Sequence, residues 1–183
     1  GAIGMCMTGN FALALMVDEH VMAPVLCQPS LPLSISKSHR RALHLTGDDL
    51  DTVKRRSNEG VTVLGLRFSE DRLCPMERFQ SLRDELGEGF EGIEIDSSAG
   101  NTNGLGRRAH SVLTHDLVDQ EGHPTIAARD RVLGQHGHLV SDSSRGDPHV
   151  VDVEAPVGGG EVYAHLRPCS GDFVIDGQNR KSR

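Results

Sequence analysis

The chain has 183 residues, of which 37% are hydrophobic, and 26 acidic against 19 basic residues give a formal net charge of −7. This charge argues against a general affinity for nucleic acid phosphates, and no apolar run approaches the roughly 20 residues that cross a membrane. We therefore expect a partner that is neither nucleic acid nor membrane. The length is sufficient for a domain with its own core.

The start of the chain has the form of a nucleophile elbow, a sharp turn that presents a nucleophile between a strand and a helix. A short apolar stretch leads into Gly4 and Cys6, and the apolar run 11–17 follows Gly9. The two glycines are small enough to let the strand and the helix approach each other, although Thr8 stands where a glycine is usual. We therefore expect a strand, a tight turn and a helix at the start of the chain.

This turn makes Cys6 a candidate nucleophile. The N-terminus of the following helix favours a thiolate, and the backbone N–H of Met7 is positioned by such a turn to donate to an oxyanion. A buried core cysteine is the alternative interpretation, because cysteine is among the most frequently buried residue types.

Residues 21–58 predict a strand followed by two helices. Residues 21–27 are apolar and indicate a strand, although Pro24 fits poorly in a central strand because it lacks an N–H. Residues 37–45 suit a short helix, and Thr46 is a candidate N-cap for a second helix that runs to about residue 58. These two helices are expected to be either a small cap over the site or plain scaffold.

The next strand ends beside two acidic residues. Residues 61–68 are apolar and β-branched, which is typical of a buried strand. Asp71 follows in a loop at the strand's carboxyl end, where open α/β sheets carry their functional groups. Glu70 is a competing acid, and a solvated turn is the ordinary environment of either side chain.

A histidine follows the last expected strand at the corresponding position. Residues 90–96 indicate a strand, and the glycine-rich loop 97–106 leads to His110. Long loops of this kind are often functional. His110 is therefore the candidate general base, arriving after the nucleophile and the acid in chain order.

Two further helices are expected, one before this strand and one after the loop. The first begins at Pro75 and ends before Gly87. Its apolar residues recur at intervals of three and four and are expected in the core: Met76, Phe79, Leu82 and Leu86. The second runs from about residue 124 through residue 133, and Gly134 and Gly137 are expected to weaken its end. We assign residues 1–140 to one domain and residues 141–183 to a poorly ordered or loosely packed tail.

The cysteines and paired histidines do not form a recognisable metal or disulfide pattern. Four cysteines, at positions 6, 27, 74 and 169, have no C-x-x-C spacing, so we expect free thiols in a reducing cytoplasm. Cys27 is expected in the core, and Cys74 is a rival nucleophile because it lies near Asp71. His136 and His138 are expected at a helix end rather than in a metal site.

These residues resemble the dienelactone hydrolase family of α/β-hydrolases. The resemblance rests on Cys6 before its apolar helix, on the strand that runs into Asp71, and on Asp96 with the loop that leads to His110, and it spans roughly residues 1–138. It implies the C-terminal part of an α/β-hydrolase sheet with flanking helices, without the N-terminal strands. It also implies a Cys-His-Asp triad of Cys6, His110 and Asp71 that cleaves lactone or carboxylic ester bonds without a cofactor or a metal.

The expected partner is a small ester or lactone, and the natural substrate is left open. Arg72, Arg107 and Arg108 lie near the predicted site, so Arg72 or Arg108 is a candidate to bind a substrate carboxylate, the alternative being solvated or locally paired arginines. A truncated, non-catalytic remnant that binds or associates through an exposed sheet edge is the alternative function. The oligomeric state is left open.

Overall fold

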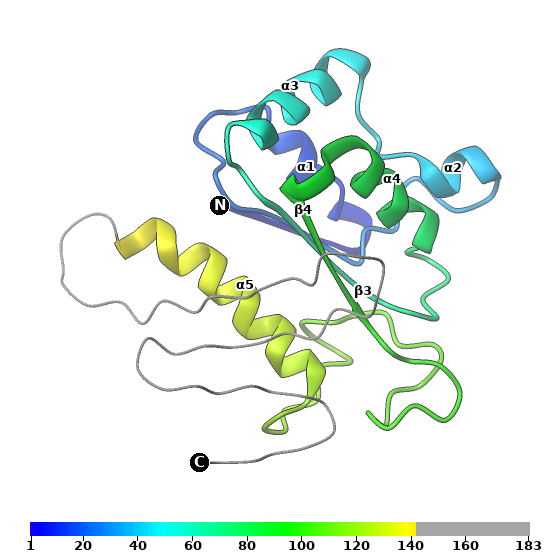
Figure 1. The fold of residues 1–183 in the computed structure, drawn as a ribbon. Coiled ribbons are helices and arrows are strands. Elements are labelled where there is room, and N and C mark those ends of the chain that lie inside the picture. The colour runs from blue at the N-terminus through cyan, green and yellow to red at the C-terminus, as the bar shows by residue number, and fades with distance from the viewer. Residues whose placement is uncertain (142–183) are drawn as a thin grey trace.

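The computed structural model describes residues 1–141 as a parallel four-stranded sheet with helices on both faces (Figure 1). The strands lie in the sheet in chain order: β1 (Ala2–Met5), β2 (Pro24–Cys27), β3 (Val63–Phe68) and β4 (Phe90–Ile95). All neighbouring pairs are parallel, so the carboxyl ends of the four strands meet at one edge of the sheet. This architecture confirms the expected α/β class.

The helices divide between the two faces of the sheet. One face carries three of them: α1 (Phe11–Leu15), α3 (Gly47–Asn58) and α4 (Met76–Leu86). The opposite face is covered by α5 (Pro124–Ser141), and the short α2 (Lys37–Arg41) packs beside α4. Two single turns of 3-10 helix complete the set: η1 (Cys6–Thr8) and η2 (Gly87–Gly89).

The core consists of one apolar cluster on each face of the sheet. On the face of α1, α3 and α4 it includes Leu13, Val53, Phe79 and Leu82. On the face of α5 it includes Val25, Leu66, Ile93, Ala128 and Val132. β3 is buried at all six positions, which is the pattern of a parallel strand whose two faces are both covered.

A glycine in the middle of β3 makes room for the aromatic part of the core. Phe79 and Phe90 meet edge to face with ring centroids 5.5 Å apart, a favourable arrangement for aromatic pairs. A Cβ at Gly65 would lie 2.7 Å from the Phe90 ring. The glycine is therefore required where α4 packs most closely on the sheet.

Several element boundaries differ from the sequence prediction. β2 begins at Pro24 rather than at residue 21, because proline fits the first position of a strand. α2 ends at Arg41 rather than at residue 45, since Ala42 is extended and His44 has a φ of 62°. The helix expected at the apolar run 11–17 is α1, which ends at Leu15. The second expected helix is confirmed, with the Thr46 side chain accepting from the backbone N–H of Asp49.

One further expectation is wrong. Met76 is 59% exposed, whereas Phe79, Leu82 and Leu86 of the same helix are buried. The last expected helix is confirmed as α5, which contains both Gly134 and Gly137 and extends to Ser141. α3 packs against α1 and α4, which makes it part of the scaffold of that face.

Residues 142–183, which make up nearly all of the predicted tail, lie outside the described residues. Within residues 1–141, β1 pairs with β2 alone, so its other side has no strand partner there.

Candidate active site

Cys6 is the first residue of η1, directly after β1, and has a backbone conformation that is uncommon for residues other than glycine. Its φ is 52°, in the left-handed region. The turn is tight enough that a Cβ at Gly4 would lie 2.2 Å from the carbonyl oxygen of Thr8, and one at Gly9 would lie 2.4 Å from Cα of Pro29. The expected need for small residues on both sides of the cysteine is confirmed.

Thr8 has a structural role at the position where a glycine was expected. Its Oγ1 accepts a hydrogen bond from the backbone N–H of Met5 at 3.1 Å and donates one to the Met5 carbonyl oxygen at 2.9 Å. This pair of bonds closes the turn around Cys6. The threonine therefore stabilises the turn from its own side chain.

The structure brings Cys6, His110 and Asp71 together in one hydrogen-bonded chain. His110 Nε2 lies 3.1 Å from Cys6 Sγ, and His110 Nδ1 lies 2.7 Å from Asp71 Oδ2. The three residues follow β1, β4 and β3 respectively, at the edge of the sheet where the strands' carboxyl ends meet. Nucleophile, base and orienting acid are thus within hydrogen-bond reach of each other.

The acid is fixed by its own loop and by a buried arginine. Asp71 Oδ1 accepts from the backbone N–H groups of Leu73 and Cys74 at 2.9 and 3.3 Å. Arg67 on β3, 2% exposed, donates to the carbonyl oxygens of Cys74 and Ser69, both at 3.0 Å. Its guanidinium also forms an ion pair with Glu94 on β4. Arg67 was not singled out from the sequence, although a charged residue within an apolar strand is the signal for it.

The base is fixed by a second carboxylate that sequence reasoning missed. Asp116 Oδ2 accepts from the backbone N–H groups of His110 and Ser111 at 2.9 and 2.8 Å. These two hydrogen bonds orient the backbone at His110 independently of the imidazole. An acid six residues after a candidate base is too common a pattern to identify without the structure.

Electrostatics at the site favour a charged pair of sulfur and imidazole. The hydrogen bond to Asp71, against the effect of burial, raises the pKa of His110 to about 9. Partial burial acts to raise the pKa of Cys6, but hydrogen bonds from Ser30 and His110, the charge of His110 and the N–H of Met7 outweigh it, so the Cys6 pKa is lowered. Both shifts act in the direction that favours a thiolate beside an imidazolium.

The other described cysteines lack these properties. Burial raises the pKa values of Cys27 and Cys74 to about 12, and both side chains are fully buried. The expectation that Cys27 lies in the core is confirmed. The proposal of Cys74 as a rival nucleophile is wrong, because its sulfur is inaccessible and its thiol is held neutral.

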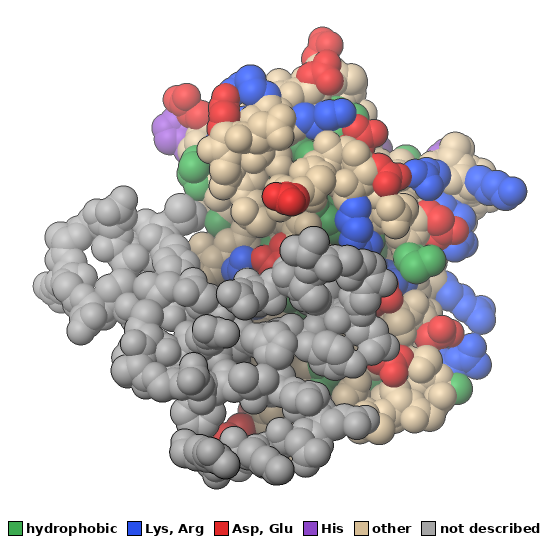
Figure 2. Space-filling model, in the orientation of Figure 1, with side chains coloured by type: hydrophobic (Ala, Val, Ile, Leu, Met, Phe, Trp, Pro, Cys, Tyr) green, Lys and Arg blue, Asp and Glu red, His purple; other side chains and the backbone are tan. Residues whose placement is uncertain are grey.

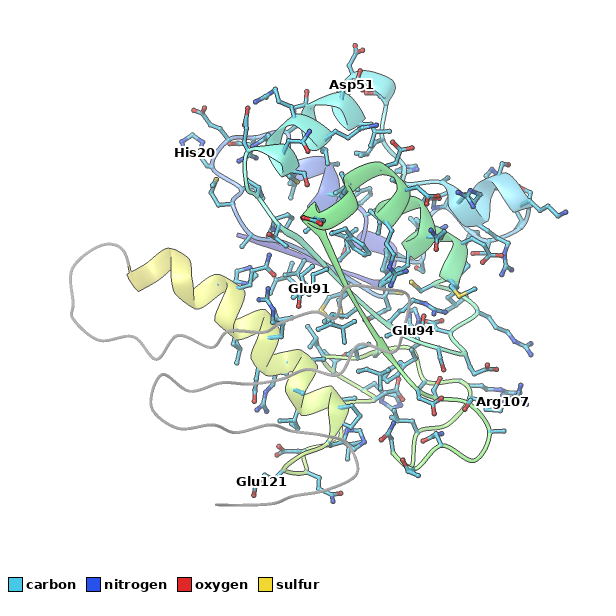
Figure 3. The ribbon with its side chains drawn as sticks, in the orientation of Figure 1. His20, Asp51, Glu91, Glu94, Arg107 and Glu121 are labelled. Carbon is cyan, nitrogen blue, oxygen red and sulfur yellow. The ribbon has the colours of Figure 1, made fainter. Side chains whose placement is uncertain are left out.

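Glu70 is engaged elsewhere. Its carboxylate lies 3.2 Å from the guanidinium of Arg107, which Figure 3 labels on the long loop that follows β4. The side chain of Glu70 is 38% exposed, against 2% for that of Asp71. Of the two acids considered from the sequence, only Asp71 contacts His110 among the described residues.

A cationic hollow of about 590 Å³ opens beside the imidazole. Three arginines face two acids across its lining, which consists of Arg72, Arg107, Arg108, Glu70, Asp71, Leu73 and His110. The predicted substrate-binding arginines are therefore next to the triad. Figure 2 shows acidic and basic side chains interspersed on the face of the molecule that it draws.

Within residues 1–141, no group of three or more histidine, cysteine, aspartate or glutamate side chains is arranged to hold a metal ion. His136 Nδ1 lies 3.0 Å from the carbonyl oxygen of Val132 within α5. In the same part of the chain, no helix combines the length and the apolar character needed to cross a membrane.

The chain matches no protein-family model, no curated protein and no solved structure.

Proposed function

We propose that this chain is a cysteine hydrolase of the dienelactone hydrolase type, cleaving lactone or carboxylic ester bonds in small molecules. The observation that carries the proposal is the chain of contacts from Cys6 Sγ to His110 Nε2, at 3.1 Å, and from His110 Nδ1 to Asp71 Oδ2, at 2.7 Å. A buried thiol in the core needs neither contact. The order of the three residues and the turn at Cys6 agree with the C-terminal part of an α/β-hydrolase.

The geometry supports acyl transfer through a thioester. The Cys6 thiolate attacks the carbonyl carbon, and the oxyanion that develops receives a hydrogen bond from the backbone N–H of Met7. His110, protonated and held by Asp71, then gives its proton to the leaving alkoxide. Water, deprotonated by the now neutral imidazole, attacks the thioester, and the acid product leaves with regeneration of the thiolate and the imidazolium.

The cationic hollow favours substrates with a carboxylate near the scissile bond. Arg107 is already paired with Glu70, whereas no carboxylate contact is recorded for Arg72 or Arg108 within residues 1–141. Arg72 and Arg108 are therefore the proposed contacts of a substrate carboxylate, with the planar guanidinium suited to bidentate recognition. Comparing hydrolysis of a carboxylated lactone with that of its methyl ester tests this assignment: equal kcat/KM for the two would contradict it.

The proposal is tested by acylation of the thiol with p-nitrophenyl acetate. We expect a burst of one p-nitrophenolate per chain and an acetyl group on the peptide that contains Cys6, identified by mass spectrometry. Cys6→Ala should abolish the burst, and His110→Ala should slow it strongly. His20→Ala, at a histidine whose side chain is 84% exposed, is the matched control and should leave it unchanged. A full burst from Cys6→Ala would refute the function.

The edge of β1, which has no strand partner on its outer side within residues 1–141, favours the second function, a binding or associating fragment without catalysis. Ile3 on β1 is 50% exposed, and Met7, Phe11 and Leu15 in the following turn and helix are 62%, 46% and 55% exposed. Apolar side chains beside an unpaired strand edge are typical of surfaces that associate. A concentration-dependent mass in sedimentation, together with no burst from the wild-type chain, would favour this function over the first.

A further inference from the structure

The loop that follows β2 supplies a second polar contact to the nucleophile. Ser30 Oγ lies 3.4 Å from Cys6 Sγ, and the backbone N–H of Ser30 donates to the Cys6 carbonyl oxygen at 2.9 Å. Ser30 is 3% exposed, so its hydroxyl faces the protein rather than solvent. The sulfur is thus contacted by the imidazole of His110 and by this hydroxyl.

A buried arginine holds this loop in place. Arg78 on α4 is fully buried, and its guanidinium donates to the carbonyl oxygens of Pro29 and Pro32 at 2.7 and 2.6 Å. It also donates to the carbonyl oxygens of His39 and Ala42 at 2.9 and 3.1 Å. Pro29 and Pro32 flank the segment that contains Ser30, so the position of the hydroxyl is fixed from α4.

A side chain from the elbow holds the same segment from the other direction. Asn10 Nδ2 donates to the carbonyl oxygen of Leu31 at 2.6 Å. Because one amide and one guanidinium bind the backbone on both sides of Ser30, its hydroxyl is preorganised toward the sulfur.

We propose that Ser30 is a further residue of the catalytic centre, whose hydroxyl donates a hydrogen bond to the Cys6 thiolate before substrate is attacked, with Arg78 as the residue that positions it. This assignment rests on the proposed function of Cys6 as a nucleophile. The hydroxyl proton stays on Ser30 throughout, and Ser30 Oγ neither forms nor breaks a covalent bond.

The bond acts on the resting thiolate more than on the later steps. A thiolate is a charged acceptor, whereas sulfur bonded to an acyl carbon is a weak one. Ser30 therefore increases the fraction of thiolate at neutral pH, and it also makes the thiolate intrinsically less nucleophilic, because nucleophilicity falls with thiol pKa.

The test is the pH profile of Cys6 alkylation by iodoacetamide, which needs no ester substrate. For Ser30→Ala we expect the midpoint of the profile to rise by roughly one pH unit. Alkylation at pH values below both midpoints should then slow by about threefold if the plateau rises with the thiol pKa, and by about tenfold if the plateau is unchanged. The plateau rate at high pH should be equal to or above that of the wild type. Ser30→Gly, a second variant without the hydroxyl, should shift the midpoint alike, and Ser30→Thr should restore it.

Ser34→Ala is the matched control, because Ser34 lies in the same loop and its Oγ has no hydrogen-bond partner among the described residues. It should leave the midpoint unchanged. Unchanged midpoints in both Ser30→Ala and Ser30→Gly would overturn the inference, as would an equal shift in Ser34→Ala. Failure of the hydrolase proposal would instead appear as absence of ester turnover in the wild type, with the alkylation shift still measurable.

Discussion

Asp71→Asn tests the triad most directly, because it removes the carboxylate charge while keeping the shape of the side chain. In the wild type, Oδ1 accepts from the N–H groups of Leu73 and Cys74, and Oδ2 contacts His110 Nδ1. Those two N–H groups require an acceptor, so the asparagine must place its carbonyl oxygen there and turn its NH₂ group toward His110. Nδ1 then has to accept, and the ring proton of the neutral imidazole moves to Nε2, which faces Cys6.

The expected magnitude follows from the pKa of the imidazole. Chiefly through its hydrogen bond with Asp71, His110 has a pKa raised from 6.5 to about 9, which corresponds to a differential interaction of about 3 kcal/mol. In Asp71→Asn we expect this pKa to fall by about two units, with the contact to Cys6 retaining the remainder. Acylation of Cys6 should slow by roughly three to four orders of magnitude, as the equivalent change does in serine proteases.

The assay combines NMR titration of the His110 ring with the burst of p-nitrophenolate from an activated ester. Glu70→Gln is the matched control, since the neighbouring acid pairs with Arg107 and does not contact the imidazole among the described residues. It should change neither quantity. An Asp71→Asn protein whose His110 pKa stays near 9, or whose acylation rate stays within about tenfold of the wild type, would refute this account of the acid.

The remaining predictions concern stability and thiol accessibility. The pKa of His110 is higher in the folded protein than in the unfolded chain. The contribution of this residue to stability is therefore fully present below about pH 6.5 and is lost as pH rises through about 9. Urea unfolding of the wild type at a series of pH values should show this loss, and the same series with His110→Gln should not. Phe79 is fully buried against Phe90, so Phe79→Ala should lower the free energy of unfolding by about 3–5 kcal/mol, and a cost below about 1 kcal/mol in urea titration would contradict the packing described. Of the three cysteines within residues 1–141, only Cys6 should react rapidly with a thiol reagent in the native protein, because the others are buried with pKa values near 12; equally fast labelling of Cys74, mapped by mass spectrometry, would argue against the structure there.

The sequence carries the elements of the site that depend on strand and turn patterns. Gly4 and Gly9 lie within a few residues of Cys6, so they predict a tight turn from the local sequence alone. The structure has that turn. The positions of Asp71 and His110 after their strands likewise follow from the rule that parallel strands present their carboxyl ends at one edge. Their meeting at hydrogen-bond distance is therefore a consequence of topology.

The contacts that decide which of two neighbouring residues enters the site join segments that are far apart in the sequence. Sequence patterns therefore do not predict them. Asp71 and Glu70 are adjacent acids in one loop, and the structure separates them through Arg67, whose side chain fixes the loop from within β3. Ser30 carries no motif, and its approach to Cys6 depends on the pairing of β1 with β2 and on Arg78 from α4. A polar residue just beyond the strand next to the nucleophile's strand is the signal that would have drawn attention to it.

The buried guanidinium groups of Arg67 and Arg78 make some loops around the site less tolerant of insertions and substitutions than others. Each arginine binds several carbonyl oxygens of a different loop, so insertions in the segments 29–42 and 69–74 would break a set of bonds at once. The loop between β4 and His110 is tied by Asn101 within the loop, by Ser97, whose Oγ accepts from the backbone N–H of Glu70, and by the exposed pair of Glu70 and Arg107. Its Leu105 and Ala109 are buried. Libraries that aim to alter substrate preference should therefore vary the exposed positions 102, 104 and 106–108 of this loop at constant length, which leaves the buried positions beside His110 and Asp71 unchanged.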